Sequence, residues 1–155
     1  MNYVGRYDEA IPIFKRLLPT GPNKATIYLG LWGAYYRKRM YDQALASARE
    51  YFASAGDGEF IAQLGTSGDA PAYRAGMKRA GEAMVVRSKE RHVPAIRIAR
   101  MFAHAGEKDL ALDWLERAYD NRESPMERIG VVWDWQDLRS EPRFQGLLRQ
   151  LNLPE

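Results

Sequence analysis

Apolar residues recur at helical spacing in the stretch from residue 26 to residue 52. The first apolar face consists of residues three and four positions apart: Tyr28, Leu31, Trp32 and Tyr35. A second such face follows after a short basic segment: Ala44, Leu45, Ala48 and Tyr51. These patterns predict two antiparallel helices joined by a tight turn. We expect Asp42 to cap the second helix and Gly56 to end it.

Part of this helical pair recurs elsewhere in the chain. Three pairs of identical residues lie 34 positions apart: Tyr7 and Tyr41, Asp8 and Asp42, Ala10 and Ala44. A third copy places Ala111 67 positions after Ala44, one short of twice that period. A small side chain at these positions lets two helix backbones approach closely. We therefore predict a helical repeat protein whose helix pairs cross at these alanines.

A 34-residue period with small residues at fixed places resembles the tetratricopeptide repeat. The packing positions of that family fall on the following residues of the central copy: Tyr28, Leu31, Tyr35, Tyr41, Ala44 and Tyr51. Trp32 and Ala48 depart from the usual residue sizes. The resemblance implies an all-α fold, a short right-handed superhelix of antiparallel helix pairs that ends in a capping helix.

The chain divides into five successive segments within a single predicted domain spanning residues 1–155. An incomplete first repeat covers 1–22, a central repeat 25–56, and an irregular repeat 57–91. The last repeat covers 92–122, and 123–155 forms a C-terminal cap. Within them we expect a helix over 8–18, a short one over 59–64, one capped by Asp69 over 70–90, and a pair over 93–104 and 109–120.

The tail has a signature of its own, with a tryptophan pair at residues 133 and 135 and an apolar run that continues to Leu151. Ser140 before Glu141-Pro142 predicts a helix start. The run from Ala99 to Pro154 resembles the closing segment of bacterial tetratricopeptide proteins, many of which carry a regulatory or catalytic front domain. That resemblance implies a sensing or scaffolding part of a larger bacterial regulatory protein.

The first repeat has an apolar helix over residues 8–18 but no preceding partner helix. Pro12 inside it predicts a kink or a late helix start. Three explanations remain open for the uncovered side of this helix. The chain belongs to a longer protein, two copies pair as a homodimer through this helix, or Met1 to Val4 folds over it.

Composition narrows the setting of the protein. The chain has 155 residues, 46% of them hydrophobic, and no cysteine, which excludes disulfides and thiolate metal sites. No apolar run approaches the roughly 18 residues that a membrane span needs, and the start lacks a signal-peptide core. We expect a soluble, cytoplasmic protein.

Charge is unevenly distributed along the chain. Residues 70–104 carry 8 basic and 2 acidic side chains, a net charge of +6, whereas residues 105–155 carry a net charge of −4. The basic stretch from Arg74 to Arg100 leaves nucleic-acid binding or another regulatory role open as an alternative function. Its only aromatic neighbour is Tyr73, and the acidic tail opposes contact with phosphates, so we do not favour this alternative.

Signatures of catalysis are absent from the sequence. It contains no phosphate-binding glycine loop, no HExxH and no GxSxG. The two histidines, His92 and His104, have no companion ligands, so we predict no metal site. We expect Asp134 and Asp137 to cap a turn or face solvent. The sequence therefore predicts a protein that is not an enzyme and that has no cofactor.

A protein or peptide partner is the function class that remains. In the tetratricopeptide family, the first helices of successive repeats line a concave groove. Carried over by position, the predicted groove consists of Leu29, Tyr36, Arg37, Ile96, Arg97, Arg100 and His104. Its arginines favour an acidic or C-terminal peptide. The family's two-carboxylate clamp needs lysine and asparagine, which these positions lack. Partner and host protein stay open.

Overall fold

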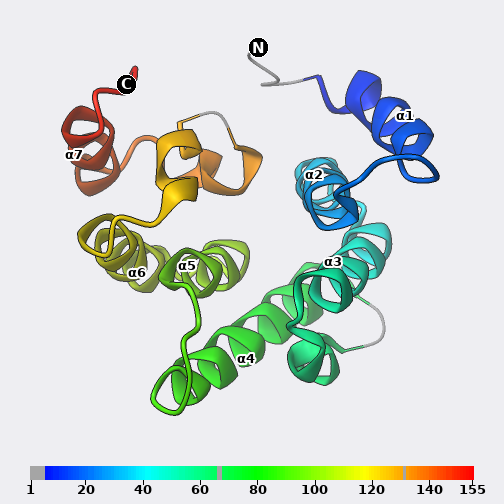
Figure 1. Cartoon of the computed structure of the whole chain (residues 1–155), viewed down its shortest axis with the longest axis horizontal. Coiled ribbons are helices and arrows are strands. Elements are labelled where there is room, and N and C mark those ends of the chain that lie inside the picture. The colour runs from blue at the N-terminus through cyan, green and yellow to red at the C-terminus, as the bar shows by residue number, and fades with distance from the viewer. Residues whose placement is uncertain (1–5, 66–67, 131) are drawn as a thin grey trace. The chain divides into compact units, whose positions relative to one another are not determined.

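The computed structural model describes residues 6–65, 68–130 and 132–155. Every element within those ranges is a helix, and the ranges contain no strand, which confirms the predicted all-α class (Figure 1). The elements are α1 (Tyr7–Leu17), α2 (Lys24–Arg37), α3 (Tyr41–Ala55), η1 (Gly58–Leu64), α4 (Ala70–Ser88), α5 (Ala95–His104), α6 (Lys108–Asp120), η2 (Ser124–Arg128), η3 (Trp133–Leu138) and α7 (Pro142–Gln150). Those labelled η are 3₁₀-helices.

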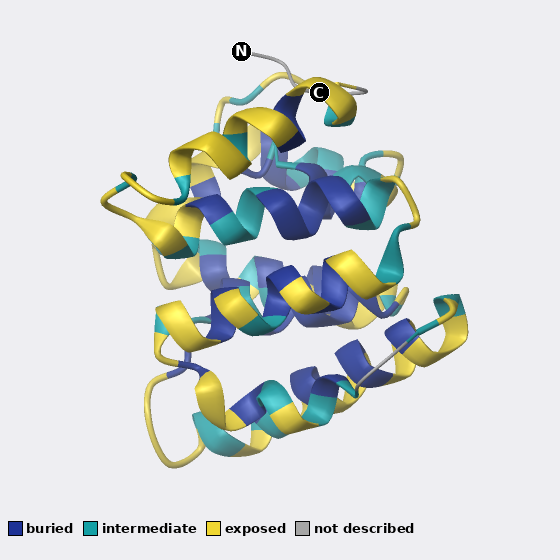
Figure 2. Cartoon of the chain, turned by 90° about the vertical axis from the view of Figure 1, so that its right-hand side faces the viewer, coloured by how far each residue is buried: buried dark blue, intermediate teal, exposed yellow. Residues whose placement is uncertain are grey.

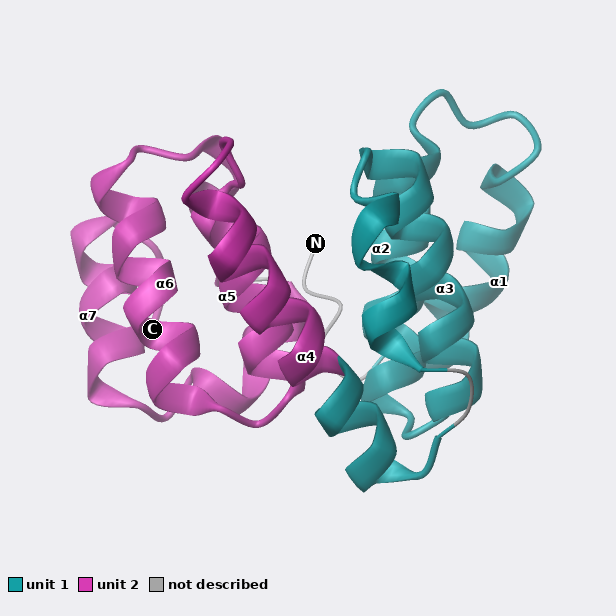
Figure 3. Cartoon of the chain, turned by 90° about the horizontal axis from the view of Figure 1, so that it is seen from below, with its two compact units in different colours: residues 1–76 teal, residues 77–155 magenta. Residues whose placement is uncertain are grey.

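The chain forms two compact units, Met1–Gly76 and Met77–Glu155 (Figure 3). Unit 1 contains α1, α2, α3, η1 and the first part of α4. Unit 2 contains the remainder of α4 and all later elements. The boundary therefore lies inside one helix, and no loop separates the units.

A helical hairpin of α2 and α3 forms the body of unit 1. The Asn23 side chain accepts a hydrogen bond from the Thr26 N–H at 3.1 Å and so caps the start of α2. Gly56 ends α3 with a φ of 83°, a left-handed conformation that glycine adopts without strain, as predicted. The apolar face of the pair is buried at Leu31, Trp32, Leu45 and Phe52.

A second hairpin, α5 with α6, forms the body of unit 2. Gly106, with a φ of 78°, lies in the turn between its two helices. Almost all of α5 is buried, since Arg97 is half-buried and the other residues of this helix are buried, whereas α6 has both buried and exposed positions. Along several helices of the chain, buried and exposed positions alternate as dark blue and yellow segments (Figure 2). Ile98, Phe102 and Leu115 belong to this core.

The three repeat alanines are buried. Ala10 retains 4% of its accessible surface, and Ala44 and Ala111 retain none. Ala44 belongs to the α2–α3 hairpin and Ala111 to the α5–α6 hairpin. The prediction that these alanines do not face solvent is confirmed.

One capping prediction is wrong. Asp42 does not cap α3: it lies in the first turn, where its carboxylate accepts the Gly68 N–H at 3.0 Å. The helix start predicted at Ser140-Glu141-Pro142 is confirmed, since α7 begins at Pro142 and its N-cap residue is Glu141. Of the two effects expected of Pro12, the late helix start does not occur, because α1 begins at Tyr7 and contains the proline. Asp42 binds the backbone at Gly68, a segment distant in sequence, and a local sequence pattern does not predict such a contact.

Other boundaries agree with expectation. Asp69 accepts the Ala72 N–H at 2.9 Å and caps α4. The buried stripe of α4 contains Tyr73, Met77, Ala80 and Met84, all fully buried, whereas Val85 is half-buried. The expected short helix over 59–64 is the 3₁₀-helix η1. The expectation for Met1 to Val4 lies outside the described residues.

Gly76 allows α4 to contact η1 without a side chain between them. A Cβ added there would lie 2.4 Å from the carbonyl oxygen of Leu64. Replacing a helical glycine with alanine ordinarily stabilises by about 1 kcal/mol. We expect Gly76→Ala instead to destabilise unit 1 by about 1–3 kcal/mol in urea unfolding, because backbone must move to relieve the overlap.

The matched control is Gly146→Ala in α7. The nearest atom to its added Cβ is 3.9 Å away, the flexible end of Arg149, so this variant is expected to be more stable by about 0.5–1 kcal/mol. A stabilising Gly76→Ala would show that α4 and η1 do not approach as closely as described.

Candidate functional site

An aromatic cluster lies around Tyr73 in unit 1. The fully buried indole of Trp32 donates its Nε1–H to the Tyr73 hydroxyl at 2.8 Å. Tyr36 stacks on Tyr73 with ring centroids 5.4 Å apart and ring planes 18° apart, and the ring of Tyr41 lies 5.2 Å away. A buried indole needs an acceptor for its N–H, and the Tyr73 hydroxyl supplies one. The cluster fixes the position of Tyr36 at the end of α2.

The exposed edge of this cluster combines an aromatic face with a cation. The Arg37 guanidinium carbon lies 5.7 Å from the centroid of the Tyr36 ring, and both side chains are half-buried. An arginine held over a ring is ordered, so it loses less conformational freedom when it binds a carboxylate. Leu29, also half-buried, lies two turns earlier on α2. This end of α2 therefore suits a ligand that carries an acidic group for Arg37 and an adjacent apolar group for Tyr36 and Leu29.

A buried ionic cluster lies in unit 2. His104 Nε2 and Asp134 Oδ1 are 2.5 Å apart, and neither residue exceeds 3% exposure. Arg100, one turn before His104 on α5, places its Nε 3.4 Å from Asp134 Oδ2, an ion-pair distance without hydrogen-bond geometry. Its guanidinium carbon also lies 5.5 Å from the Trp135 ring centroid. The cluster attaches η3 to α5 through a charged contact.

Electrostatics keep Asp134 ionised in this environment. Burial alone would raise the pKa of the Asp134 carboxyl. The charge of Arg100, together with the hydrogen bond and charge of His104, outweighs burial and lowers that pKa below the ordinary 3.8. A buried carboxylate between two basic side chains is thus a stabilised anion, and it holds Arg100 and His104 in place.

The predicted groove residues fall into two sets. Leu29, Tyr36 and Arg37 lie on α2 in unit 1, and the other four lie on α5 in unit 2. Of the α5 set, Arg97 is half-buried, while Ile96, Arg100 and His104 are 3%, 5% and 0% exposed. The structure gives these three a packing role within unit 2. A groove that joins the two sets stays a prediction.

Asp134 is a residue whose role the sequence interpretation missed. The expectation that it caps a turn or faces solvent is wrong, because it is 3% exposed and paired with α5. Two signals were available. Asp134 lies between two tryptophans, and Arg100 and His104 are spaced four apart on one helical face. Neither signal identifies the partner without the fold.

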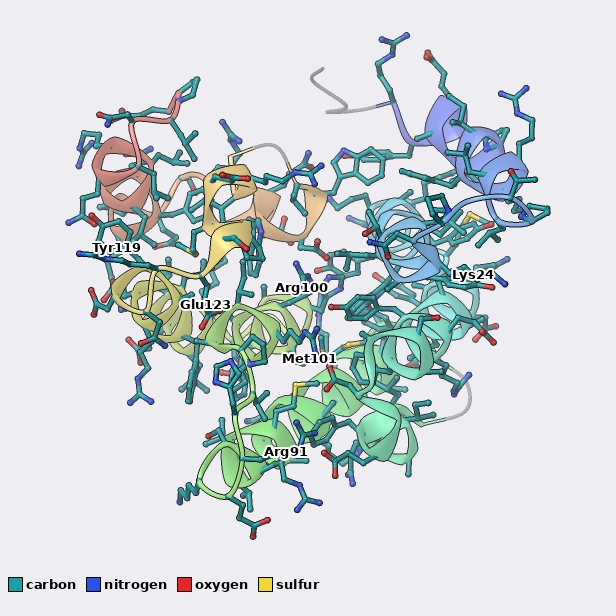
Figure 4. All side chains as sticks on the ribbon, viewed as in Figure 1. Lys24, Arg91, Arg100, Met101, Tyr119 and Glu123 are labelled. Carbon is teal, nitrogen blue, oxygen red and sulfur yellow. The ribbon has the colours of Figure 1, made fainter. Side chains whose placement is uncertain are left out.

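Glu123 is a second such residue. Its Oε2 accepts the Ala95 N–H at 2.9 Å and its Oε1 accepts the Ile96 N–H at 3.0 Å. These are two of the N–H groups that the start of a helix leaves without partners. Glu123 follows α6 and thus closes the α5–α6 hairpin across its open end (Figure 4). The carboxylate also complements the positive end of the α5 dipole.

A surface hollow of about 480 Å³ adjoins this carboxylate in unit 2. It extends from Tyr119 and Asp120 at the end of α6 through η2 to Leu151. The carboxylates of Asp120, Glu123 and Glu127 line it together with the guanidinium of Arg122, and the Glu123 carboxylate already accepts hydrogen bonds from the start of α5. Within the described residues, no three histidine, aspartate or glutamate side chains form a group that could hold a metal ion. None of the described helices combines the length and apolarity of a membrane span.

Comparisons with known proteins return no family assignment. No protein-family model matches the sequence, and neither a curated protein nor a solved structure matches the chain. The function must therefore be argued from the chain's own residues.

Proposed function

We propose that this chain is a non-catalytic protein–protein interaction module of the tetratricopeptide type, within a larger bacterial regulatory protein. The observation that carries the proposal is the burial of Ala44 and Ala111, one in each helical hairpin, at matching places of the sequence repeat. Repeated hairpins of this kind act as surfaces that hold other proteins. The proposed ligand is a peptide or helix with an acidic group.

The contact surface of the proposal is restricted to side chains that reach solvent. Leu29, Tyr36 and Arg37, all on α2 of unit 1, meet that condition and form the proposed contact surface. Tyr36 supplies apolar area, and Arg37 supplies donors for a carboxylate. Replacing Arg100 would test folding and not binding, because it is buried with Asp134.

Selection from displayed random peptides tests the proposal with the whole chain as bait. We expect enrichment of acidic peptides, because Arg37 can make charge-assisted hydrogen bonds to a carboxylate. Arg37→Glu is expected to weaken binding of the selected peptide by about tenfold or more, because a charge-assisted contact becomes repulsion. Tyr36→Ala is expected to weaken it as well. Fluorescence anisotropy measures both losses.

Lys24→Glu is the matched control, since it makes the same charge change at the exposed start of the same helix. It is expected to bind like the unchanged chain, and circular dichroism verifies that each variant is folded. Absence of any enriched peptide, or equal loss with Lys24→Glu and Arg37→Glu, would contradict the proposed site.

Nucleic-acid binding through residues 74–100 has less support. Lys78 pairs with Glu107 at 3.3 Å and Arg87 pairs with Glu90 at 2.7 Å, which neutralises part of the basic charge. Tyr73, the aromatic residue that would stack on bases, is fully buried. Filter binding at low salt separates the two functions, because contact with phosphates weakens steeply as salt rises.

A further inference from the structure

Arg39, in the turn between α2 and α3, has a backbone conformation that favours glycine. Its φ is 59°, which lies in the left-handed region that residues with a side chain rarely adopt. The Arg39 N–H donates to the Tyr36 carbonyl oxygen at 3.0 Å. The next N–H, that of Met40, donates to the Tyr35 carbonyl oxygen at 2.9 Å. Helices commonly end with this pair of bonds, and the left-handed residue between them is usually glycine.

The other copies of the sequence repeat have glycine at the position of Arg39. Gly106 lies 67 positions after Arg39, the same separation as that of the repeat alanines in the two hairpins, and Gly5 lies 34 positions before it. Gly106 follows α5 with a φ of 78°, and the turn after α5 has the same pair of hydrogen bonds. The central copy therefore has an arginine at a position where glycine satisfies the fold.

The guanidinium of Arg39 has no partner within the part of the chain that the structure describes. The side chain is exposed, and no hydrogen bond or ion pair joins it to another described residue. Two carboxylates near this turn already have partners, since Asp8 is bound by Lys38 and Asp42 accepts a backbone N–H. Attraction to the carbonyl end of α2 does not require Arg39, because Arg37 and Lys38 already place cations there.

Arg39 adjoins the proposed peptide site. Its backbone N–H is bonded to Tyr36, and the Tyr36 ring has the Arg37 guanidinium 5.7 Å from its centroid. A side chain that is kept in an unfavourable backbone conformation next to a binding surface indicates a function for that side chain. The chemistry of a guanidinium identifies the function as contact with an anion, because it donates two parallel hydrogen bonds to a carboxylate.

We infer that Arg39 is a second carboxylate-binding residue of this site and that the bound peptide carries two neighbouring acidic residues. One acidic side chain pairs with Arg37 and the other with Arg39, while an apolar residue of the peptide contacts Tyr36 and Leu29. The inference rests on the proposed function and makes its ligand more specific, from a peptide with one acidic group to a peptide with two.

Arg39→Gly is expected to change stability and binding in opposite directions. The urea midpoint should rise by roughly 0.3 M, because the strain removed exceeds the flexibility that glycine adds to the unfolded chain. Binding of the acidic peptide enriched by the unchanged chain should weaken about tenfold, because the guanidinium is lost. Urea unfolding and fluorescence anisotropy measure the two effects. Arg39→Lys keeps a cation and is expected to retain most of the affinity.

Arg122→Gly is the matched control. Arg122 has a φ of 56° in the turn after α6, and its N–H donates to the Tyr119 carbonyl oxygen at 3.0 Å. The substitution therefore removes the same kind of strain and the same charge, but in unit 2 and outside the proposed contact surface. It is expected to raise the urea midpoint as Arg39→Gly does and to bind the peptide like the unchanged chain.

A second selection from displayed random peptides, with Arg39→Gly as bait, tests the class of ligand. The unchanged chain is expected to enrich peptides with two acidic residues close together in sequence. The variant is expected to enrich peptides with one, because only Arg37 remains to bind a carboxylate. Identical acidic patterns from the two baits would contradict a second carboxylate contact.

The outcomes separate this inference from the function on which it rests. Loss of binding with Arg37→Glu and full affinity with Arg39→Gly would overturn the role of Arg39 and leave the proposed function standing. Equal loss with Arg39→Gly and Arg122→Gly would overturn it as well, and so would a urea midpoint that Arg39→Gly does not raise. If the unchanged chain enriches no peptide, the inference fails together with the proposed function.

Discussion

Replacing Asp134 with alanine is expected to destabilise unit 2 by about 3–5 kcal/mol, because Arg100 loses its buried counter-charge and His104 loses its buried hydrogen-bond partner. The substitution removes the carboxylate and leaves Arg100 and His104 buried, where water cannot take the place of the carboxylate. Urea unfolding measures the loss. Hydrogen exchange of α5 and η3 localises it, since these are the elements that Asp134 connects.

Asp120→Ala at the exposed end of α6 is the control, and its effect on the free energy of unfolding is expected to lie within about 0.5 kcal/mol.

Unfolding in acid supplies a second test of the Asp134 carboxylate. The pKa of Asp134 is lowered on folding, so its contribution is complete above the ordinary value of 3.8 and is lost as pH falls through the lowered pKa. The difference in the free energy of unfolding between the unchanged chain and Asp134→Ala should therefore become smaller in strong acid. A constant gap would mean that the carboxylate charge is not what stabilises the contact.

Trp32→Ala is expected to cost unit 1 about 3–5 kcal/mol, the usual penalty for emptying a buried tryptophan site. The ring centroid of the indole lies 6.0 Å from that of Phe52, in an edge-on arrangement, and 5.7 Å from that of Tyr51. The indole N–H donates a hydrogen bond to the Tyr73 hydroxyl. A cavity at this point faces both α3 and α4. The expected local readout is faster hydrogen exchange in α2 and α3.

Two variants separate the volume of Trp32 from its hydrogen bond. Trp32→Phe keeps most of the ring and loses the bond to Tyr73, so it is expected to cost about 1–2 kcal/mol. Trp114→Ala on α6 removes a half-buried indole whose main partner is Arg117, 4.4 Å from its ring centroid, and is expected to cost about 1 kcal/mol. Equal losses for Trp32→Ala and Trp114→Ala would show that Trp32 is not a core residue of unit 1.

Local patterns predicted the helices well. The spacing of Leu31 and Trp32 identified the inner face of α2, Gly56 identified the end of α3, and Asp69 the start of α4. Each of these signals acts within one or two turns of the same helix. Such short-range rules are readable because the residues that interact are neighbours in sequence.

Interactions between distant segments were not readable in the same way. Asp42 has the right residue type for a cap, but its carboxylate binds the Gly68 N–H, 26 residues away. Glu123 caps a helix that begins 28 residues earlier, and Asp134 is buried by a helix 30 residues before it. A carboxylate in a sequence shows that an acceptor exists, and only the fold determines which donor reaches it.

A residue can line the predicted groove only if its side chain is exposed. Its position in the family's repeat pattern does not show whether this is so. Tyr36 and Arg37 reach the surface, whereas His104 is completely covered although it occupies a groove position by analogy with the family. The reason is Asp134 in η3, because its carboxylate contacts His104 and η3 covers that face of α5.

The boundary between the two units falls within α4, at Gly76 and Met77, and this has a consequence for melting. Hydrogen bonds in a helix connect residues four apart, so several bonds near that boundary have their donor in one unit and their acceptor in the other. Neither unit can lose its part of α4 without fraying the end of the other's part. Thermal unfolding of the two halves is thereby linked through the main chain, as a flexible linker would not allow.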